Sequence, residues 1–289
     1  MSHEIVLAVA NKWIPLSKGG QPDEALYEGL PPWIAASIYG WTQKTLDELS
    51  WTRSEDVEQT LTEAFDREMR LALPLSISRY NVTTELQKRR DESLTLDYVD
   101  FLLAQIGDSL PSRTLEAILE QGGSAWRVGS RNGFFGLERR VPIAAMEAAE
   151  AAMASNGDAG VLLNEAWVAV YGRNPDPEDA YEKAIKAVES SAAPKVAPDD
   201  RKATLGKIVS VLRSQTDWAL ALTDSEGKHD YGVVAAMCAA LWNGQPSRHG
   251  GNGYRKPTVE EAEIAVQLAV SLVQWFSADA VRRRPRPRS

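Results

Sequence analysis

The segment Asn243–Gly253 holds the densest group of polar residues in the chain, NGQPSRHGGNG. Its four glycines let the backbone approach a ligand closely and expose Arg248 and His249. A histidine whose pKa lies near neutrality can move protons, and a neighbouring arginine can hold a phosphate. Metal-independent RNA cleavage needs both functions, to activate the 2′-hydroxyl and to stabilise the charged phosphorane. In the alternative interpretation, the pair only connects a glycine-rich loop to helix ends through hydrogen bonds.

Three further side chains are candidate RNA contacts. Trp242 immediately precedes the polar loop and can stack on a base, and Arg255 follows the loop. Arg173 lies beside the start of the last helical group, where it can hold a phosphate. In the alternative interpretation Trp242 is a core residue, and the segment around Arg173 is a turn in which Asp176 caps a helix.

The residue types give little support to metal or cofactor chemistry. One cysteine, Cys238, and three histidines exclude a Cys/His zinc cluster. The chain contains no P-loop, no dinucleotide-binding glycine fingerprint, no GxSxG elbow and no HExxH helix. We therefore expect neither a metal nor a cofactor, and we interpret Cys238 as a small buried hydrophobic residue on the apolar face of a helix.

Composition and charge narrow the function further. The 289 residues are 44% hydrophobic and 25% charged, which is typical of a globular protein. The net charge is −8, and removing the five arginines of the last eight residues, RRRPRPRS, leaves −13 for the rest. An acidic body repels phosphates and does not suit broad nonspecific duplex binding, so any nucleic-acid contact must be local. The basic tail could provide such a contact, or it could be a solvated, disordered segment.

The sequence predicts a cytoplasmic protein without membrane association. No apolar run approaches the roughly 20 residues that cross a bilayer. Within the first 21 residues the apolar core is limited to Ile5–Ala10, preceded by Glu4, which is unlike a signal peptide. A single cysteine agrees with a reducing compartment.

The hydrophobic periodicity predicts a mainly α protein. In the first part of the chain, helices are predicted at 33–39, 55–73, 85–90, 96–106, 112–120, 143–155 and 160–171. One segment differs, because Ser124–Val128 and Leu137–Val141 alternate around the turn-rich Gly129–Gly136, which predicts a small β-hairpin near 124–141. The tryptophans are scattered along the chain, so we interpret all except Trp242 as core residues.

The last third predicts a bundle of four amphipathic helices. Asp176-Pro177 begins the first, which Pro194 and Pro198 end, and Thr204 caps the second. Asp230–Trp242 is the third, and a capping box at Thr258–Glu261 begins the fourth. This division predicts a mostly helical N-terminal region over 1–172, a helical domain over 173–281 and a disordered basic tail over 282–289.

The segment 176–276 resembles the C-terminal domain of abortive-infection proteins, a branch of the HEPN superfamily. The resemblance rests on DPEDAYEKAIKAVES, TLGKIV and LWNGQPSRHGGNGYRKPTVEEAEIAVQLAVSLVQWF. It covers about a third of the chain. The upstream stretch AWVAVYGRNPDP is similar to actinobacterial and actinophage proteins of this type. The resemblance implies an all-α bundle, dimerisation through that bundle and a role in conflict between bacteria and phages.

Many HEPN domains are ribonucleases that use an Arg-x4–6-His motif. In this chain His249 matches the family histidine and Asn243 matches the polar residue after the arginine, but Trp242 occupies the arginine position. If the domain is catalytic, the resemblance makes His249 the general acid/base, Arg248 the phosphate-stabilising cation and Asn243 an orienting group. Tryptophan cannot hold a phosphate, so this departure favours a degenerate domain.

Two hypotheses follow from these observations. In the first, the chain engages RNA through Asn243–Gly253, as a metal-independent ribonuclease in its strongest form. In the second, it is a non-catalytic interaction module in which Trp242, the glycine-rich loop and the apolar last helix serve protein association. There the acidic N-terminal region recognises a protein partner.

Overall fold

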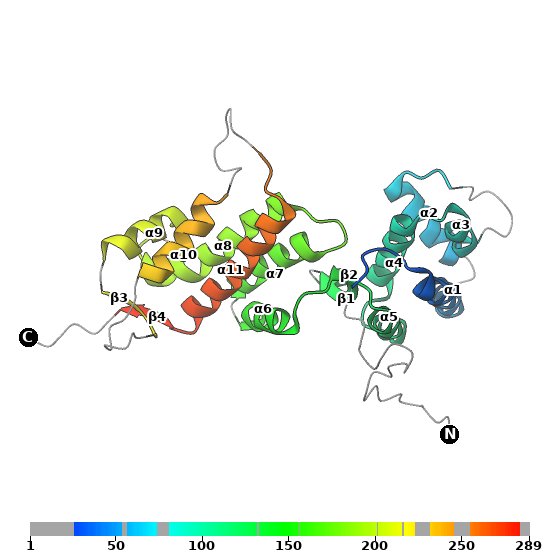
Figure 1. Cartoon of the computed structure of the whole chain (residues 1–289), viewed down its shortest axis with the longest axis horizontal. Coiled ribbons are helices and arrows are strands. Elements are labelled where there is room, and N and C mark those ends of the chain that lie inside the picture. The colour runs from blue at the N-terminus through cyan, green and yellow to red at the C-terminus, as the bar shows by residue number, and fades with distance from the viewer. Residues whose placement is uncertain are drawn as a thin grey trace, which may run out of the picture. The chain divides into compact units, whose positions relative to one another are not determined.

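The computed structural model describes residues 26–53, 57–73, 81–131, 133–155, 157–200, 202–215, 217–222, 232–245 and 255–283. This part of the chain is mainly helical, as predicted, and a two-stranded hairpin follows α5 in the chain (Figure 1). The chain forms two compact units, and the boundary between them falls inside the hairpin, between residues 129 and 138. Each unit has its own hydrophobic core.

The described part of the N-terminal unit contains five helices and most of the hairpin. The helices are α1 (Pro32–Arg53), α2 (Val57–Met69), α3 (Val82–Arg89), α4 (Glu92–Ile106) and α5 (Leu110–Gln121). Asn81, Asp91 and Ser109 begin α3, α4 and α5, because each side chain accepts a hydrogen bond from a backbone N–H of the first turn. The core consists mostly of leucines and aromatic rings, with Phe65 packed edge-to-face on Tyr98.

The predicted hairpin is present as strands β1 (Trp126–Arg131) and β2 (Phe134–Arg139). The strands extend further into the glycine-rich segment than the alternation indicated, and Gly133, at φ +88°, occupies the turn. Two carboxylates of the N-terminal unit bind the hairpin backbone. Glu116 accepts from the Val128 N–H at 2.5 Å, and Asp100 accepts from the Leu137 N–H at 2.6 Å.

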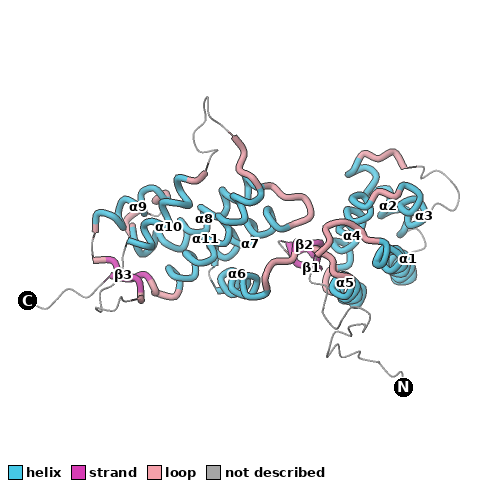
Figure 2. The backbone as a smooth tube through the Cα atoms, viewed as in Figure 1, coloured by secondary structure: helices cyan, strands magenta, loops and turns pink. Residues whose placement is uncertain are grey.

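The C-terminal unit contains six described helices and a short antiparallel sheet (Figure 2). The helices are α6 (Ile143–Ser155), α7 (Gly157–Tyr171), α8 (Pro177–Val196), α9 (Leu205–Ser214), α10 (Gly232–Asn243) and α11 (Val259–Ser277). The sequence predicts that this domain begins at residue 173. The compact unit begins earlier, because Ala149 and Ala152 of α6 and Leu163 and Trp167 of α7 are buried in its core.

Local signals located most helix ends in this unit. The Thr258 capping box forms as predicted, with Glu261 accepting from the Thr258 N–H at 2.9 Å. The prediction for Pro194 was wrong, because α8 continues past it to Val196. A proline near a helix end removes one backbone donor and leaves the rest of the turn intact.

The predicted disordered tail needs a correction at its first residues. Val281–Arg283 form strand β4, which pairs antiparallel with β3 (Trp218–Leu220), so Arg282 and Arg283 belong to the fold. The Arg283 guanidinium lies 4.9 Å from the Trp218 ring centroid and 3.2 Å from a carboxylate oxygen of Asp217. The remaining tail residues, 284–289, lie outside the described residues.

For two tryptophans the prediction that they are core residues was wrong. Trp41, Trp126, Trp167 and Trp218 are buried as predicted, but Trp33 is 58% exposed and Trp51 is 89% exposed. None of the described helices combines the length and the apolar composition needed to cross a membrane.

Candidate functional site

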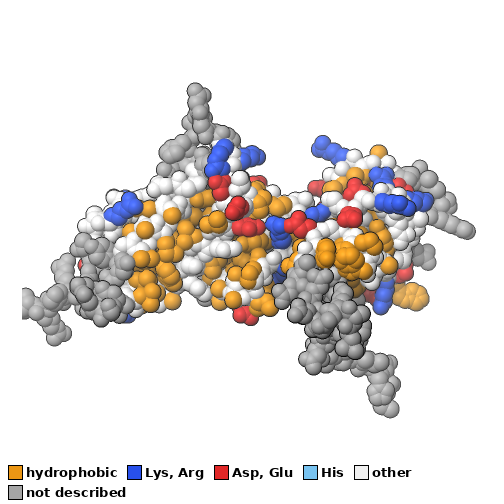
Figure 3. Space-filling model, in the orientation of Figure 1, with side chains coloured by type: hydrophobic (Ala, Val, Ile, Leu, Met, Phe, Trp, Pro, Cys, Tyr) orange, Lys and Arg blue, Asp and Glu red, His pale blue; other side chains and the backbone are white. Residues whose placement is uncertain are grey.

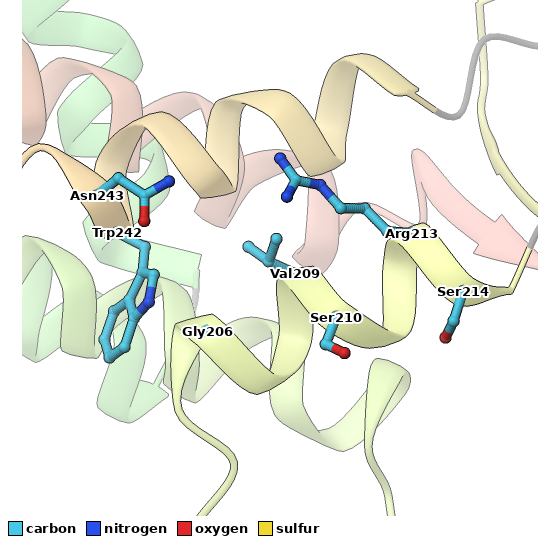
Figure 4. A pocket seen from close by; sticks show the side chains of 7 residues that line it. All are labelled: Gly206, Val209, Ser210, Arg213, Ser214, Trp242 and Asn243. Carbon is cyan, nitrogen blue, oxygen red and sulfur yellow. The ribbon is translucent and has the colours of Figure 1, made fainter.

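A surface pocket of about 470 Å³ lies between α9 and the C-terminal end of α10 (Figure 4). We call it the α9–α10 pocket. It is lined by Gly206, Val209, Ser210, Arg213, Ser214, Trp242 and Asn243. Two residues singled out from the sequence, Trp242 and Asn243, therefore meet a face of the preceding helix.

The position of the Trp242 indole depends on the absence of a side chain at Gly206. A Cβ atom placed on Gly206 would lie 2.7 Å from Nε1 and 2.8 Å from Cε2 of Trp242. Carbon and nitrogen atoms do not approach this closely without a bond, so only glycine allows the ring to lie on the α9 backbone. One side of the pocket is thus formed by a tryptophan ring that lies against a helix.

The C-terminal end of α10 also contacts α8. The Tyr181 hydroxyl of α8 donates to the Leu241 carbonyl at 3.1 Å, which satisfies one of the free carbonyls at the helix end. Burial raises the pKa of Tyr181, and the negative charge of Glu261 adds to this effect. A Cβ atom on Gly244 would lie 2.5 Å from the same hydroxyl, so a second glycine permits the contact. These contacts fix Trp242 and Asn243.

The electrostatic character of the pocket differs from that of the whole chain. Arg213 is exposed and makes no hydrogen bond or ion pair with the residues that the structure describes. Its guanidinium group and the Asn243 amide point toward each other across the pocket (Figure 4). No carboxylate is found among the lining residues. Among the described residues, the lining therefore offers a cation without an ion-pair partner, an amide and an indole, in a chain of net charge −8.

Arg255 lies in a different environment. Its guanidinium group makes a bidentate ion pair with Glu261, at 2.5 and 2.7 Å, on the residue that completes the α11 capping box. This hydrogen-bonded pair lowers the pKa of Glu261 to about 2. The charge of Arg255 is thus already matched at the start of α11.

The other predicted site residues are separated from the pocket or cannot be placed. Arg173 is half-buried in the connection between α7 and α8 and does not line the pocket. Arg248 and His249 lie outside the described residues, in the segment 246–254 that follows the end of α10. The structure thus brings Trp242 and Asn243 together and leaves Arg173 apart.

Sequence reasoning missed Arg213 and Gly206. Arg213 occupies the last turn of α9, where a cation is explained by the helix dipole alone, so its position carried no functional signal. Gly206 lies near the start of the same helix, and glycine is unfavourable inside a helix. Its presence there could have indicated that another group contacts the helix backbone closely.

Cys238 is fully buried on α10, and burial raises the pKa of its thiol to about 12. Cys238 is therefore a core residue, as the sequence predicted, and its environment does not favour a thiolate nucleophile.

Comparison of the chain with family models, with curated proteins and with solved structures gave no match in any of the three.

Proposed function

We propose that the C-terminal unit binds single-stranded RNA at the α9–α10 pocket. The observation that carries this proposal is that Trp242, Asn243 and Arg213 line one pocket, and that the described residues supply neither a carboxylate to its lining nor an ion-pair partner to Arg213. An indole face supplies a stacking surface for a base, and a guanidinium group supplies a partner for a phosphate. Because the acidic chain repels phosphates, a nucleic-acid site needs a local positive charge, and Arg213 supplies one.

Arg213 can also replace the arginine that this chain lacks in the HEPN motif. Trp242 occupies the position of the family arginine, and Arg213 supplies a cation to the same pocket from the neighbouring helix. In its catalytic form, the proposal assigns His249 as general acid/base, Arg213 or Arg248 as the phosphate-stabilising cation and Asn243 as the orienting group. The resemblance of 176–276 to abortive-infection proteins supports a role in conflict between bacteria and phages.

The test is RNA binding measured by fluorescence anisotropy with labelled single-stranded oligonucleotides. We expect Trp242→Ala and Arg213→Met each to weaken binding about tenfold, from the stacking and charge-assisted terms. Arg213→Met should also reduce the dependence of affinity on salt. Matched controls are Trp51→Ala and Arg67→Met, which change exposed residues of the N-terminal unit.

Binding that is equal in all four variants would contradict the proposal. Trp242→Phe keeps an aromatic ring and should retain most of the affinity, which separates stacking from a folding defect. Cleavage is tested separately with labelled tRNA and mRNA in EDTA, beside His249→Ala. Cleavage that this variant loses would establish the ribonuclease, whereas intact RNA would leave binding as the function.

A second candidate function, a protein-interaction module, is favoured by one observation. Ile143, Val161 and Ile264 expose large aliphatic side chains on three helices of the C-terminal unit. Figure 3 shows hydrophobic side chains spread over the helices of this unit. In this alternative the unit forms a homodimer. Analytical ultracentrifugation of the wild-type chain and of Ile264→Lys tests it, and we expect dissociation of the dimer in the variant.

A further inference from the structure

A second pocket, of about 590 Å³, lies at the C-terminal part of α8, and we call it the α8 pocket. Its walls come from the last turns of α8, the first turn of α7 and the segment that leads into α9. It shares no lining residue with the α9–α10 pocket. Its volume falls in the range of sites that hold small molecules.

Pro194 leaves a backbone acceptor at this pocket. In a helix the carbonyl of Ser190 accepts from the N–H of residue 194, and proline has no N–H. Because α8 continues to Val196, the Ser190 carbonyl stays inside the helix without its usual donor. Both Ser190 and Pro194 line the pocket.

Two carboxylates add further acceptors. Glu189 is half-buried and uses one oxygen to accept from the Leu205 N–H at 2.6 Å, and the structure gives its second oxygen no partner among the described residues. Burial raises the pKa of this carboxyl. Asp158, in the first turn of α7, makes no hydrogen bond or ion pair within the described part of the chain. Lys202 is the single described cation that lines the pocket.

We propose that the α8 pocket binds a small molecule that carries a primary aliphatic amine. A primary ammonium group has three N–H donors, and three of the residues that line the pocket carry acceptor groups: the Ser190 carbonyl and the carboxylates of Glu189 and Asp158. Charge-assisted bonds to the two carboxylates supply the affinity. A diamine and a basic amino acid both provide this chemistry. They differ in the carboxylate that a basic amino acid would place against Lys202.

The test is isothermal titration calorimetry of the full chain with cadaverine and with L-lysine. We expect binding of at least one probe, and a loss of about tenfold or more in affinity in Asp158→Asn and in Glu189→Gln. Glu189→Gln keeps an oxygen for the Leu205 N–H and so separates ligand binding from folding. Glu150→Gln, on an exposed position of α6, removes the same charge outside the pocket and should leave affinity unchanged.

Lys202→Met distinguishes the two ligand sources. If the ligand is a basic amino acid, this variant weakens L-lysine binding and leaves cadaverine binding unchanged. If it is a diamine, cadaverine binds the wild-type chain at least as tightly as L-lysine. The proposal is overturned if neither probe binds at millimolar concentration, or if Glu150→Gln weakens binding as much as Asp158→Asn does, because a general attraction to the acidic chain would then explain the result.

Discussion

The two compact units hold their helices together in different ways. In the N-terminal unit, carboxylates bind backbone N–H groups of loops and strands, and large side chains fill the core. In the C-terminal unit, alanines let helix backbones approach closely. The N-terminal unit therefore depends on a few polar contacts and on large side chains that fill its core. The C-terminal unit depends on short side chains that leave room for neighbouring helix backbones.

Five carboxylate contacts characterise the N-terminal unit. The pairs are Glu92 with the Leu30 N–H, Asp66 with Leu73, Glu58 with Val82, Asp100 with Leu137 and Glu116 with Val128. Each connects a helix to a segment that has no regular partner for that N–H. A buried backbone donor without a partner is costly, so these side chains allow two loops, the start of α3 and the two hairpin strands to pack on the helices.

The C-terminal core has a different composition. Alanines lie along the buried faces of α8 and α11, including Ala180, Ala184, Ala187, Ala265 and Ala269. No alanine is among the residues of the N-terminal core cluster, as far as the described residues extend. Short side chains bring two helix axes closer together, so the structure tolerates little added volume there.

The largest expected effect is the loss of volume in the N-terminal core. Leu103 of α4 is fully buried, and Leu103→Ala should destabilise the protein by about 3–5 kcal/mol through lost burial and a cavity. Urea unfolding followed by circular dichroism measures this. A loss below about 1 kcal/mol would show that this core collapses around the cavity and would weaken the comparison.

The opposite change tests the C-terminal core. Ala184→Leu adds volume where α8 packs and should cost about 1–3 kcal/mol, because the added atoms force neighbouring side chains out of their rotamers. The control is Ala144→Leu on an exposed position of α6, which should change the unfolding free energy by less than about 0.5 kcal/mol. If the two substitutions have equal effects, close helix packing is not what the alanines provide.

Removal of one carboxylate contact should have a smaller effect. Glu92→Ala removes the acceptor of the Leu30 N–H, which lies at 2.9 Å, and should cost about 1 kcal/mol. Glu120→Ala removes an exposed carboxylate of α5 and serves as the matched control. Thermal unfolding of both variants is the measurement, and an unchanged midpoint for Glu92→Ala would reject a stabilising role for this contact.

The smallest effect is a pH dependence of opposite sign in the two units. Burial raises the pKa of Glu58, so its contribution to stability is present below about 4.5 and is lost as pH rises through the folded-state pKa. The ion pair lowers the pKa of Glu261 to about 2, so its contribution is present above about 4.5 and is lost as pH falls toward 2.

Substitution by glutamine separates the two contributions. Between pH 4 and pH 7, Glu58→Gln should gain stability relative to the wild-type chain. From pH 4.5 down to pH 2, the deficit of Glu261→Gln should shrink. Unfolding midpoints across this pH range measure both. Identical pH profiles for both variants and the wild-type chain would show that neither carboxyl contributes.

Much of the fold could be predicted because its signals are local. Thr258, Asp176 and the periodicity of α9 predicted helix positions, since a cap bonds within its own first turn and a helix face repeats every 3.6 residues. The hairpin was predicted from alternation and glycine for the same reason. These interactions span few residues, so neighbours in sequence determine them.

The candidate site could be predicted only in part. Trp242 and Asn243 were found because they adjoin a polar loop, but Arg213 comes from another helix and reaches the pocket through packing. The pairing of β3 with β4 joins residues more than 60 positions apart, and no local pattern indicated it. Trp51 shows the reverse case, since residue type suggested burial and the fold left the side chain exposed.

By itself, the sequence determined that the protein is mainly α and where the helices capped by Asp176, Thr204 and Thr258 begin. Its acidic charge predicts that any contact with nucleic acid is local. Tertiary structure alone decided that α6 and α7 join the C-terminal unit, that Gly206 admits the Trp242 ring, and that Arg213 faces Asn243. The physical reason is the range of the interactions. Caps and periodicity act within a few residues, whereas packing and the pairing of charges depend on which segments the folded chain brings together.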